Sequence, residues 1–167
     1  MRTRTTFVPS TAACSIERSL TVLGERWAML IVRDAHAGVT RFADFQQRLG
    51  ISPDVLSARL ETLVAAGVLE KRAVQPAGER ARGAYHLTPA GIQLRIVLGA
   101  LQQWGDEHLR PDDDPAYLRR HVPDGRPVRV AFIDDDGPAL DPADVSIGVP
   151  ARDGPGRNVL PAGPETP

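Results

Sequence analysis

Two amphipathic helices joined by only three residues constrain the fold of this chain more than any other feature. The first helix has an apolar face that consists of Phe42, Phe45 and Leu49. The second has an apolar face that consists of Leu56, Leu60 and Leu63. Between them lie Gly50, Ile51 and Ser52, where glycine suits a left-handed helix end and serine suits an N-cap. Helices joined in this way form a helix-turn-helix.

We expect two further helices before this pair. The spacing of apolar side chains predicts a first helix over residues 16–23 and a second over residues 27–35, which Gly38 ends. Thr40 is the expected cap of the first helix of the pair, and Gly67 ends the second. The pair is therefore embedded in a mainly helical domain.

A two-stranded hairpin and a last helix complete the pattern. Residues 68–74 and 84–87 can run extended on either side of a turn-rich segment with a basic tip. Thr88 and Pro89 then repeat the cap-plus-proline start and open one long helix to about His108. The apolar residues of that helix cover more than one face, so we expect it to pack against its own core and against a second chain.

Composition changes near Arg110. Residues 1–110 hold 14 Lys and Arg against 10 Asp and Glu, whereas residues 111–167 hold 6 against 11. Eleven of the 15 prolines lie at or after Pro111, so long helices are not expected there. We predict three regions: a winged helix-turn-helix domain over 1–110, a Pro/Asp-rich appendage over 111–151 and a disordered tail over 152–167.

The appendage is expected to hold a small β-hairpin. Apolar residues alternate before and after an Asp-Asp-Gly turn, at Val128, Val130, Phe132, Val145, Ile147 and Val149. The acidic run around this turn does not have the spacing of a calcium loop.

Several classes of function receive no support. No apolar stretch reaches the roughly 18 residues that span a bilayer, and no cleavable signal is visible, so we expect a cytoplasmic protein. The single cysteine, Cys14, excludes an internal disulfide and a Cys-based metal cage. The four histidines are scattered, and no nucleophile motif or phosphate loop is present. We therefore expect no enzyme, no catalytic residue, no cofactor and no metal.

The expected elements together describe a winged helix, an α+β fold that is mainly α. In such a fold the second helix of the pair lies in the major groove of DNA, and the hairpin contacts the flanking backbone. The expected partner is a double-stranded DNA operator. Because a fold alone does not determine a function, a winged-helix module that binds proteins without specific DNA binding stays the alternative.

The sequence also resembles the HxlR-type regulators, which are related to MarR. The motifs that carry the resemblance are CSIER (14–18), LGERW (23–27), RFADF (41–45), ISPDVLSARL (51–60), Leu63, GVL (67–69) and YHLTPAG (85–91). Their order and spacing over about residues 14–109 make the similarity specific. Some longer relatives of the family carry a C-terminal Cys-paired metal ribbon, to which the tail is only weakly similar, and this chain lacks those cysteines, so we expect no zinc.

The resemblance implies a homodimeric transcription factor, such as a repressor. It also implies that the first and last helices of the domain form the dimer contact. The apolar residues of this chain that we assign to that contact are Ile16, Leu20, Ile96, Leu101 and Trp104. A homodimer on its operator is therefore the expected assembly.

Helix geometry selects the side chains of the second helix of the pair that face DNA. With its leucines buried, the opposite face and its flanks carry Asp54, Val55, Ser57, Ala58, Arg59 and Thr62. Arg59 is the expected donor to guanine or phosphate, and Ser52 with the free amides behind it can hold a phosphate. Asp54 either accepts from a cytosine amine or complements the helix dipole, and we favour the dipole.

Basic residues of the hairpin are the remaining candidates for contact with DNA. They are Arg72, Arg80 and Arg82. On a wing these guanidinium groups would meet backbone phosphates, although similar charges also occur on ordinary surface hairpins.

Cys14 allows two interpretations. It stands immediately before the first helix, where unpaired amides and the helix dipole favour a thiolate, and Arg18 lies one turn along. It also matches an N-terminal cysteine that several members of the resembled family use to sense oxidants or electrophiles. A lone cysteine is otherwise a small buried apolar residue. Under the first interpretation an oxidant or a small molecule is an effector.

Overall fold

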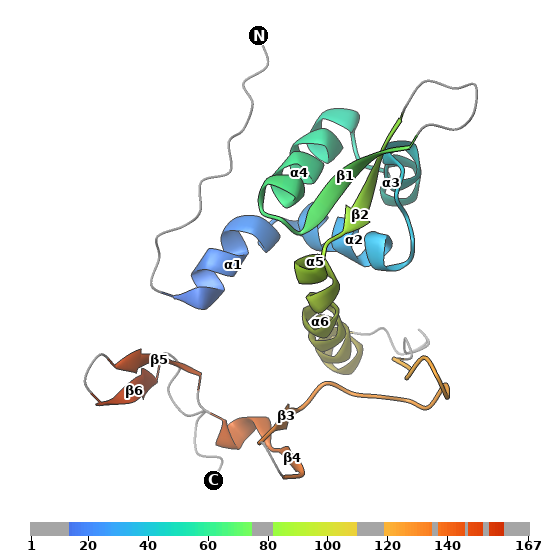
Figure 1. Cartoon of the computed structure of the whole chain (residues 1–167). Helices are drawn as coiled ribbons and strands as arrows, with labels where there is room; N and C mark the ends of the chain where they lie inside the picture. Colours follow the sequence, from blue (N-terminus) through green and yellow to red (C-terminus); the bar gives the residue numbers. More distant parts are fainter. Residues whose placement is uncertain are drawn as a thin grey trace. The chain divides into compact units, whose positions relative to one another are not determined.

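The computed structural model describes residues 14–74, 82–109, 119–134, 137–145, 147–151 and 154–158. The chain forms two compact units, residues 1–102 and residues 103–167, whose elements are labelled in Figure 1. The division falls inside one helix, before the boundary expected near Arg110.

Four helices open the first unit. They are α1 (Ser15–Leu23), α2 (Arg26–His36), α3 (Phe42–Leu49) and α4 (Pro53–Ala65). Gly50 ends α3 in the left-handed conformation, with φ 61°, and Pro53 is the first residue of α4, as the sequence predicts. The helix-turn-helix therefore consists of α3 and α4. In the described part of the chain, no helix is long and apolar enough to cross a membrane.

One predicted cap lies at a different residue, and another lacks its capping hydrogen bond. The N-cap of α3 is Arg41 and not Thr40, because the Thr40 carbonyl accepts the Tyr85 N–H at 2.8 Å and Arg41 forms a β-bridge with Ala84. This segment thus extends the hairpin before α3 begins. Ser52 is the N-cap of α4, as predicted, but its side chain makes no capping hydrogen bond.

The predicted wing is an antiparallel hairpin of β1 (Leu69–Val74) and β2 (Arg82–Leu87). Arg82 begins β2, whereas the sequence placed it in the turn and began the strand at Ala84. The difference arises because backbone pairing continues past Ala84, so that Arg82 lies opposite Val74 in spite of Gly83 between them. The predicted tip, including Arg80, lies outside the described residues.

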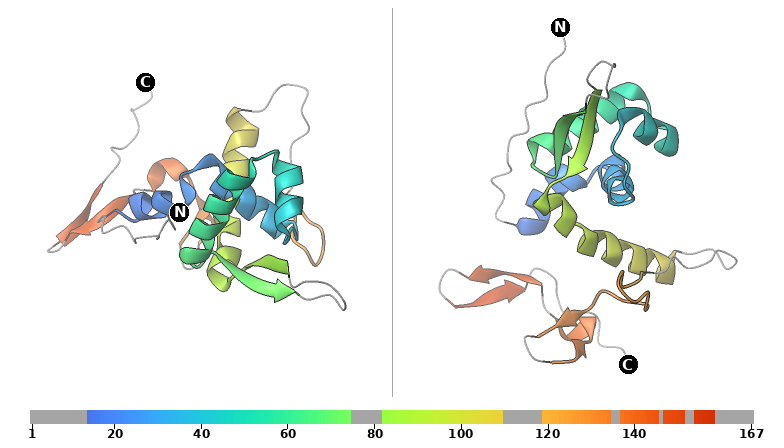
Figure 2. Two further views of the ribbon diagram at one scale, coloured as in Figure 1. Left: turned by 90° about the horizontal axis from the view of Figure 1, so that it is seen from above. Right: turned by 45° about the vertical axis from the view of Figure 1, so that its right-hand side comes forward.

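The single long helix expected after Thr88 is two helices, α5 (Pro89–Gln93) and α6 (Arg95–His108). Thr88 caps α5 as predicted, since its Oγ1 accepts the Gly91 N–H at 3.1 Å. The Leu94 N–H donates to the Gly91 carbonyl, three residues back, at 3.2 Å. This tightened turn interrupts the helix. The right-hand view of Figure 2 shows α6 continuing from α5 in a changed direction.

The core of the first unit lies between α2, α3, α4 and the base of the hairpin. Its largest fully buried apolar side chains are Phe45, Ile31, Leu56, Leu60, Leu63, Leu69 and Val32. The apolar face predicted for α4 is thus confirmed, whereas on the face predicted for α3, Phe45 is buried and Phe42 and Leu49 are partly buried. Gly91 packs its backbone directly on the residue before β1, since a Cβ there would lie 2.2 Å from the Val68 carbonyl oxygen.

In the second unit, the segment after α6 is anchored on that helix. The Gln103 side chain accepts the Val130 N–H at 2.9 Å and donates to the Val130 carbonyl at 3.1 Å. Arg119 Nη1 and Asp106 Oδ2 form an ion pair at 3.1 Å. These contacts attach the segment that contains Arg119 and Val130 to the C-terminal half of α6.

The strands of the second unit differ from the single predicted hairpin. The pairs are β3 (Phe132–Ile133) with β4 (Ala139–Leu140), and β5 (Gly148–Ala151) with β6 (Gly154–Asn158); a 3-10 turn, η1 (Pro142–Asp144), lies between them. The described tail therefore holds two small hairpins, and β6 occupies a segment that we expected to be disordered. Backbone pairing needs no apolar side chain, which is why hydrophobic alternation missed β6.

Candidate nucleic-acid interface

The helix α4 presents a polar face on a buried apolar base. Leu56, Leu60 and Leu63 have no exposed surface, so helical geometry directs the residues between them outward. The predicted contact residues at the start of α4 are exposed, namely Ser52, Asp54 and Val55. Those farther along are partly buried, namely Ser57, Ala58, Arg59 and Thr62.

Arg59 is held by an acidic residue from outside the helix pair. Its Nη2 lies 3.6 Å from Oε2 of Glu25, the N-cap residue of α2. The Arg59 side chain is 30% exposed, and its Nε is buried without a hydrogen-bond partner. A pair this open to solvent contributes only about 0–1 kcal/mol to stability. Arg59 can therefore exchange Glu25 for a phosphate or a guanine at small cost.

The other polar groups of α4 are mostly satisfied within the helix. Ser57 Oγ lies 3.5 Å from Glu61 Oε1, and Thr62 Oγ1 donates to the Ala58 carbonyl at 3.0 Å. Glu61 is exposed and was not among the contact residues predicted from the sequence. Together with Asp54 it gives α4 two carboxylates against one arginine. Attraction between α4 and DNA phosphates must therefore be supported by other elements.

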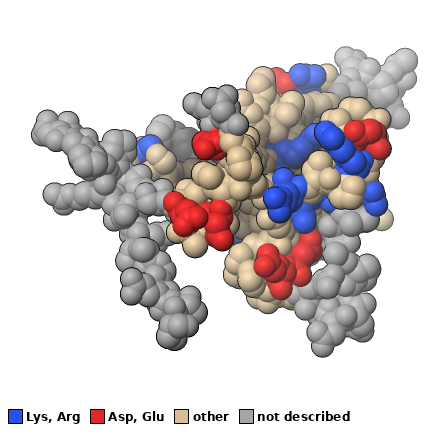
Figure 3. Space-filling view, turned by 90° about the horizontal axis from the view of Figure 1, so that it is seen from below, with Lys and Arg blue, Asp and Glu red and all other residues tan. Residues whose placement is uncertain are grey.

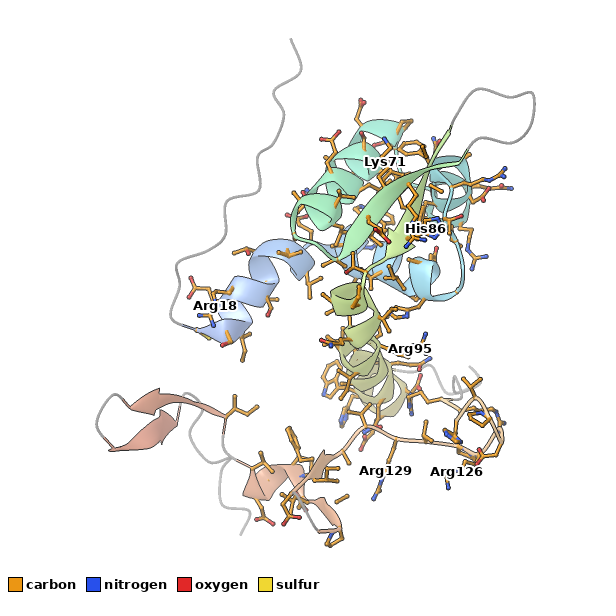
Figure 4. The ribbon with its side chains drawn as sticks, viewed as in Figure 1. Arg18, Lys71, His86, Arg95, Arg126 and Arg129 are labelled. Carbon is orange, nitrogen blue, oxygen red and sulfur yellow. The ribbon has the colours of Figure 1, made fainter. Side chains whose placement is uncertain are left out.

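The wing supplies basic side chains on both of its faces. Lys71 Nζ lies 5.5 Å from the ring centroid of Tyr85, its cross-strand partner, whereas Arg72 forms an ion pair with Glu70. Because side chains alternate along a strand, Lys71 and Arg72 point to opposite faces. Figure 4 shows Lys71 and His86 on the two strands. Sequence reasoning selected Arg72 and missed Lys71, although Lys71 is the neighbouring residue.

The other two arginines predicted to contact DNA from the wing are Arg80 and Arg82. Arg82 is placed by its backbone opposite Val74, and Arg80 lies outside the described residues. On the face shown in Figure 3, basic and acidic side chains both occur. That face carries no single sign of charge.

A buried carboxylate connects α2 to α3. Asp34 is 1% exposed, its Oδ1 lies 2.8 Å from Arg33 Nη2, and its Oδ2 lies 3.5 Å from Arg48 Nε. Asp34 was not among the residues predicted from the sequence. The available signal was a charged residue three positions after Ile31, on the buried face of α2.

The apolar side chains predicted for the dimer contact are exposed in the single chain. Each is more than half exposed, namely Ile16, Leu20, Ile96, Leu101 and Trp104. Neither α1 nor α6 has a fully buried residue. Exposed apolar side chains on two helices are typical of a surface that another chain covers.

Cys14 is the N-cap residue of α1, half-buried and free. Its side chain makes no capping hydrogen bond, and its carbonyl accepts the Arg18 N–H at 3.1 Å. The Arg18 guanidinium donates to Ser15 Oγ at 2.8 Å. Among the residues that the structure describes, no three His, Cys, Asp or Glu side chains are arranged to hold a metal ion.

Comparison with known protein families also identifies a helix-turn-helix in this chain. The model of the HxlR-like helix-turn-helix family matches residues 22–113, more than half of the chain. The chain belongs to the HxlR-like helix-turn-helix family. The matched HxlR-like region contains α2 to α6, and thus the helix pair, the wing and the last helix.

Related HxlR-like sequences are named as regulators of transcription. Rv3095 of Mycobacterium tuberculosis, an uncharacterized HTH-type transcriptional regulator, is 43% identical over 109 residues, which cover 65% of this chain and 68% of the relative. The HTH-type transcriptional regulator YodB of Bacillus subtilis is 28% identical over 105 residues, which cover 62% of this chain and 92% of YodB.

Solved structures show the same winged helix-turn-helix. The crystal structure of PA1607, a candidate transcription factor, is 37% identical with a TM-score of 0.73, and covers 86% of this chain and 97% of PA1607. The reduced form of YodB has a TM-score of 0.52 at 28% identity, and covers 60% of this chain and 98% of YodB. The HxlR-like chain is therefore a winged helix-turn-helix protein of a transcription-regulating, DNA-binding family.

Proposed function

We propose that this chain is a homodimeric, sequence-specific regulator that places α4 of each subunit in the major groove of an operator. The observation that carries the proposal is the outward polar face of α4 above its buried leucines. In a helix-turn-helix this second helix contacts base edges near its N-terminal end. Ser52 has no intrahelical capping bond, so its hydroxyl and the first amides of α4 are suited to a phosphate.

Individual side chains of α4 have distinct proposed roles. Arg59 reads guanine or binds phosphate after it leaves Glu25, and Val55 and Ala58 offer apolar contact to thymine methyl groups. Asp54, in the first turn of α4, complements the helix dipole. Lys71 and the arginines of the wing bind the flanking backbone.

The dimer is proposed to form through α1 and α6. These helices carry the exposed apolar side chains Ile16, Leu20, Ile96, Leu101 and Trp104. A two-fold dimer would cover these side chains and present two α4 helices about 34 Å apart, one turn of DNA.

The proposal is tested with the full chain and DNA from its own promoter, by fluorescence anisotropy across a salt series. We expect specific binding that unrelated DNA does not displace at equal concentration. The logarithm of affinity should fall with a slope near −0.9 per neutralised phosphate, steeply for a dimer that uses about three basic side chains per subunit. Absence of both specific binding and a salt slope would reject the proposal.

A winged-helix module that binds proteins without specific DNA binding is the second candidate. The two carboxylates of α4, Asp54 and Glu61, favour it, because they repel phosphate. The basic wing favours DNA. This candidate predicts that the anisotropy series shows no sequence preference, and that binding partners are proteins that contact the exposed face of α4.

We also propose that Cys14 makes the regulator responsive to oxidants or electrophiles. A half-buried free thiol at the start of α1 supports this, because α1 is one of the two proposed dimer helices. The reduced form of the relative YodB has been solved. Since Cys14 is the single cysteine, its oxidation can produce a sulfenic acid, a mixed disulfide or a bridge between subunits.

A further inference from the structure

The junction between α5 and α6 is bridged by a side chain from α2. His36 Nε2 lies 3.1 Å from the Gly91 carbonyl oxygen, and Arg95 Nε and Nη2 lie 3.4 and 3.3 Å from His36 Nδ1. Gly91 belongs to α5 and Arg95 is the first residue of α6, so one imidazole ring contacts both sides of Leu94. Figure 4 shows Arg95 at the α5–α6 junction.

These contacts determine where the ring carries its proton. The Gly91 carbonyl can only accept, so His36 Nε2 carries the hydrogen, and the Arg95 guanidinium can only donate, so Nδ1 is unprotonated. A doubly protonated ring would place an N–H against the Arg95 guanidinium. In agreement with this geometry, burial and the charge of Arg95 lower the pKa of His36 below 6.5, against an opposing effect of the Gly91 carbonyl.

The same junction is where the helix is interrupted. The Gly91 carbonyl accepts from His36 and also from the Leu94 N–H, in the three-residue turn that separates α5 from α6. A side chain that inserts at a helical carbonyl is a known cause of helix bending. The backbone of Gly91 packs closely on the residue before β1, since a Cβ at this position would lie 2.2 Å from the Val68 carbonyl oxygen. The helix α5 therefore packs against the core, and the imidazole ring lies where α5 ends and α6 begins.

We propose that His36 is a positioning residue that sets the direction of α6 relative to the DNA-binding core, and thereby the spacing of the two α4 helices in the dimer. The inference rests on the proposed function, in which α6 carries the dimer contact and α4 the operator contact. α6 has 14 residues. At 1.5 Å per residue it is about 20 Å long, so a change of about 10° at Leu94 moves its far end by about 3–4 Å.

The charge state of the ring gives the junction a dependence on pH. The charged group that faces the ring is the Arg95 guanidinium of α6, and the group from α5 is the uncharged Gly91 carbonyl. Among the described residues, no carboxylate forms an ion pair with the ring. Protonation of Nδ1 removes the acceptor of Arg95 and adds a like charge beside it. Acid therefore loosens the α2–α6 contact while the contact with Gly91 can persist.

The ring itself is tested by ¹⁵N NMR of the histidine side chains, on the full chain without DNA. We expect the Nε2–H tautomer for His36 and titration below pH 6.5. Arg95→Gln keeps a donor for Nδ1 and removes the positive charge, so it should raise the pKa of His36 and preserve the tautomer. An Nδ1–H tautomer, or a pKa of His36 that Arg95→Gln leaves unchanged, would overturn the assignment.

The spacing is tested on operator fragments whose half-sites are moved by one base pair in either direction, with an isolated half-site as reference. We expect wild type to prefer one spacing by at least tenfold. His36→Ala should reduce that preference to less than threefold or move it to another spacing, with half-site affinity within twofold of wild type. His36→Gln, which retains a donor for the Gly91 carbonyl, should restore part of the preference, and His121→Ala in the second unit should match wild type.

An unchanged spacing preference in His36→Ala contradicts the proposal. If His36→Ala does not fold, His36→Gln and Arg95→Leu replace it, and a preference equal to wild type in both contradicts the proposal. If wild type binds no operator at any spacing, the proposed function fails. The NMR measurement needs no DNA and still decides whether His36 holds the junction.

Discussion

In the protein without DNA, Arg59 forms an ion pair with Glu25, and this pair competes with binding to DNA. Because Glu25 is paired with the Arg59 guanidinium, Glu25→Gln should raise operator affinity by up to about fivefold, which corresponds to the upper end of the 0–1 kcal/mol of an exposed pair. Arg59→Gln should lower affinity by about tenfold or more. Fluorescence anisotropy on the operator measures both changes. The double variant is the control, and a gain from Glu25→Gln that persists without Arg59 would show that the pair is not the cause.

Gly91 is required by a close approach of two backbones. A Cβ at this position would lie 2.2 Å from the Val68 carbonyl oxygen, so Gly91→Ala should lower the free energy of unfolding by about 1–3 kcal/mol. Gly105 in α6 is the matched control, since a Cβ there meets nothing within 4 Å. Gly105→Ala should leave stability unchanged or raise it by about 0.5–1 kcal/mol. Urea unfolding measures both, and equal effects would contradict the packing argument.

Cys14 can act as a sensor only if reagents reach its thiol. We expect the native protein to react with an aromatic disulfide reagent, and operator affinity to change by severalfold on that reaction. Cys14→Ser should bind the operator and show no response. A thiol that is inert in the native protein, or a Cys14→Ser variant that responds like wild type, would make Cys14 a packing residue.

At the scale of secondary-structure elements, the proposed dimer is tested most directly on α6. Leu101 is 53% exposed on its apolar face. Leu101→Glu should shift the dimer towards monomer in sedimentation velocity and weaken operator binding at least tenfold, because it places a charge in the proposed contact. Glu107→Ala, on the same helix, should remain dimeric. If Leu101→Glu stays dimeric and binds unchanged, the interface lies elsewhere.

The contact between α2 and the α5–α6 junction should make stability depend on pH. The pKa of His36 is lower in the folded chain than its ordinary 6.5, so the unfolded chain binds the proton first as pH falls. Its contribution to stability is therefore complete above about pH 6.5 and is lost as pH falls toward the folded pKa. Urea unfolding at pH 7.5 and 5.5 should show a larger loss for wild type than for His36→Gln. Equal losses would contradict this coupling.

Local signals predicted the elements that depend on neighbouring residues. Gly50 ends α3 with a left-handed backbone, Pro53 begins α4, and Thr88 caps α5, each as its residue type indicates. The break at Leu94 was not predictable in this way. It involves His36, which is 55 positions from Gly91 in the sequence.

At the scale of the whole molecule, we expect the segment around Val130 in the second unit to need its hydrogen bonds to Gln103. Gln103 makes two hydrogen bonds to the backbone of Val130, so Gln103→Ala should speed hydrogen exchange of the Val130 amide by about fivefold or more, equivalent to about 1 kcal/mol. Amides of α4 should exchange as in wild type. Gln103→Glu, which keeps the acceptor, should have a smaller effect, and unchanged exchange at Val130 in Gln103→Ala would show that the attachment is not needed.

The sequence by itself determined the helix-turn-helix, the wing and the buried leucines of α4, because apolar spacing and turn chemistry act over a few residues. The tertiary structure decided the pairing of Arg59 with Glu25, the burial of Asp34 and the division of the last helix. It also decided the pairing of β5 with β6. The first three features depend on contacts between residues that are distant in the sequence, and the pairing of β5 with β6 depends on backbone hydrogen bonds that any side chain permits. Neither kind of contact leaves a periodic pattern in the sequence.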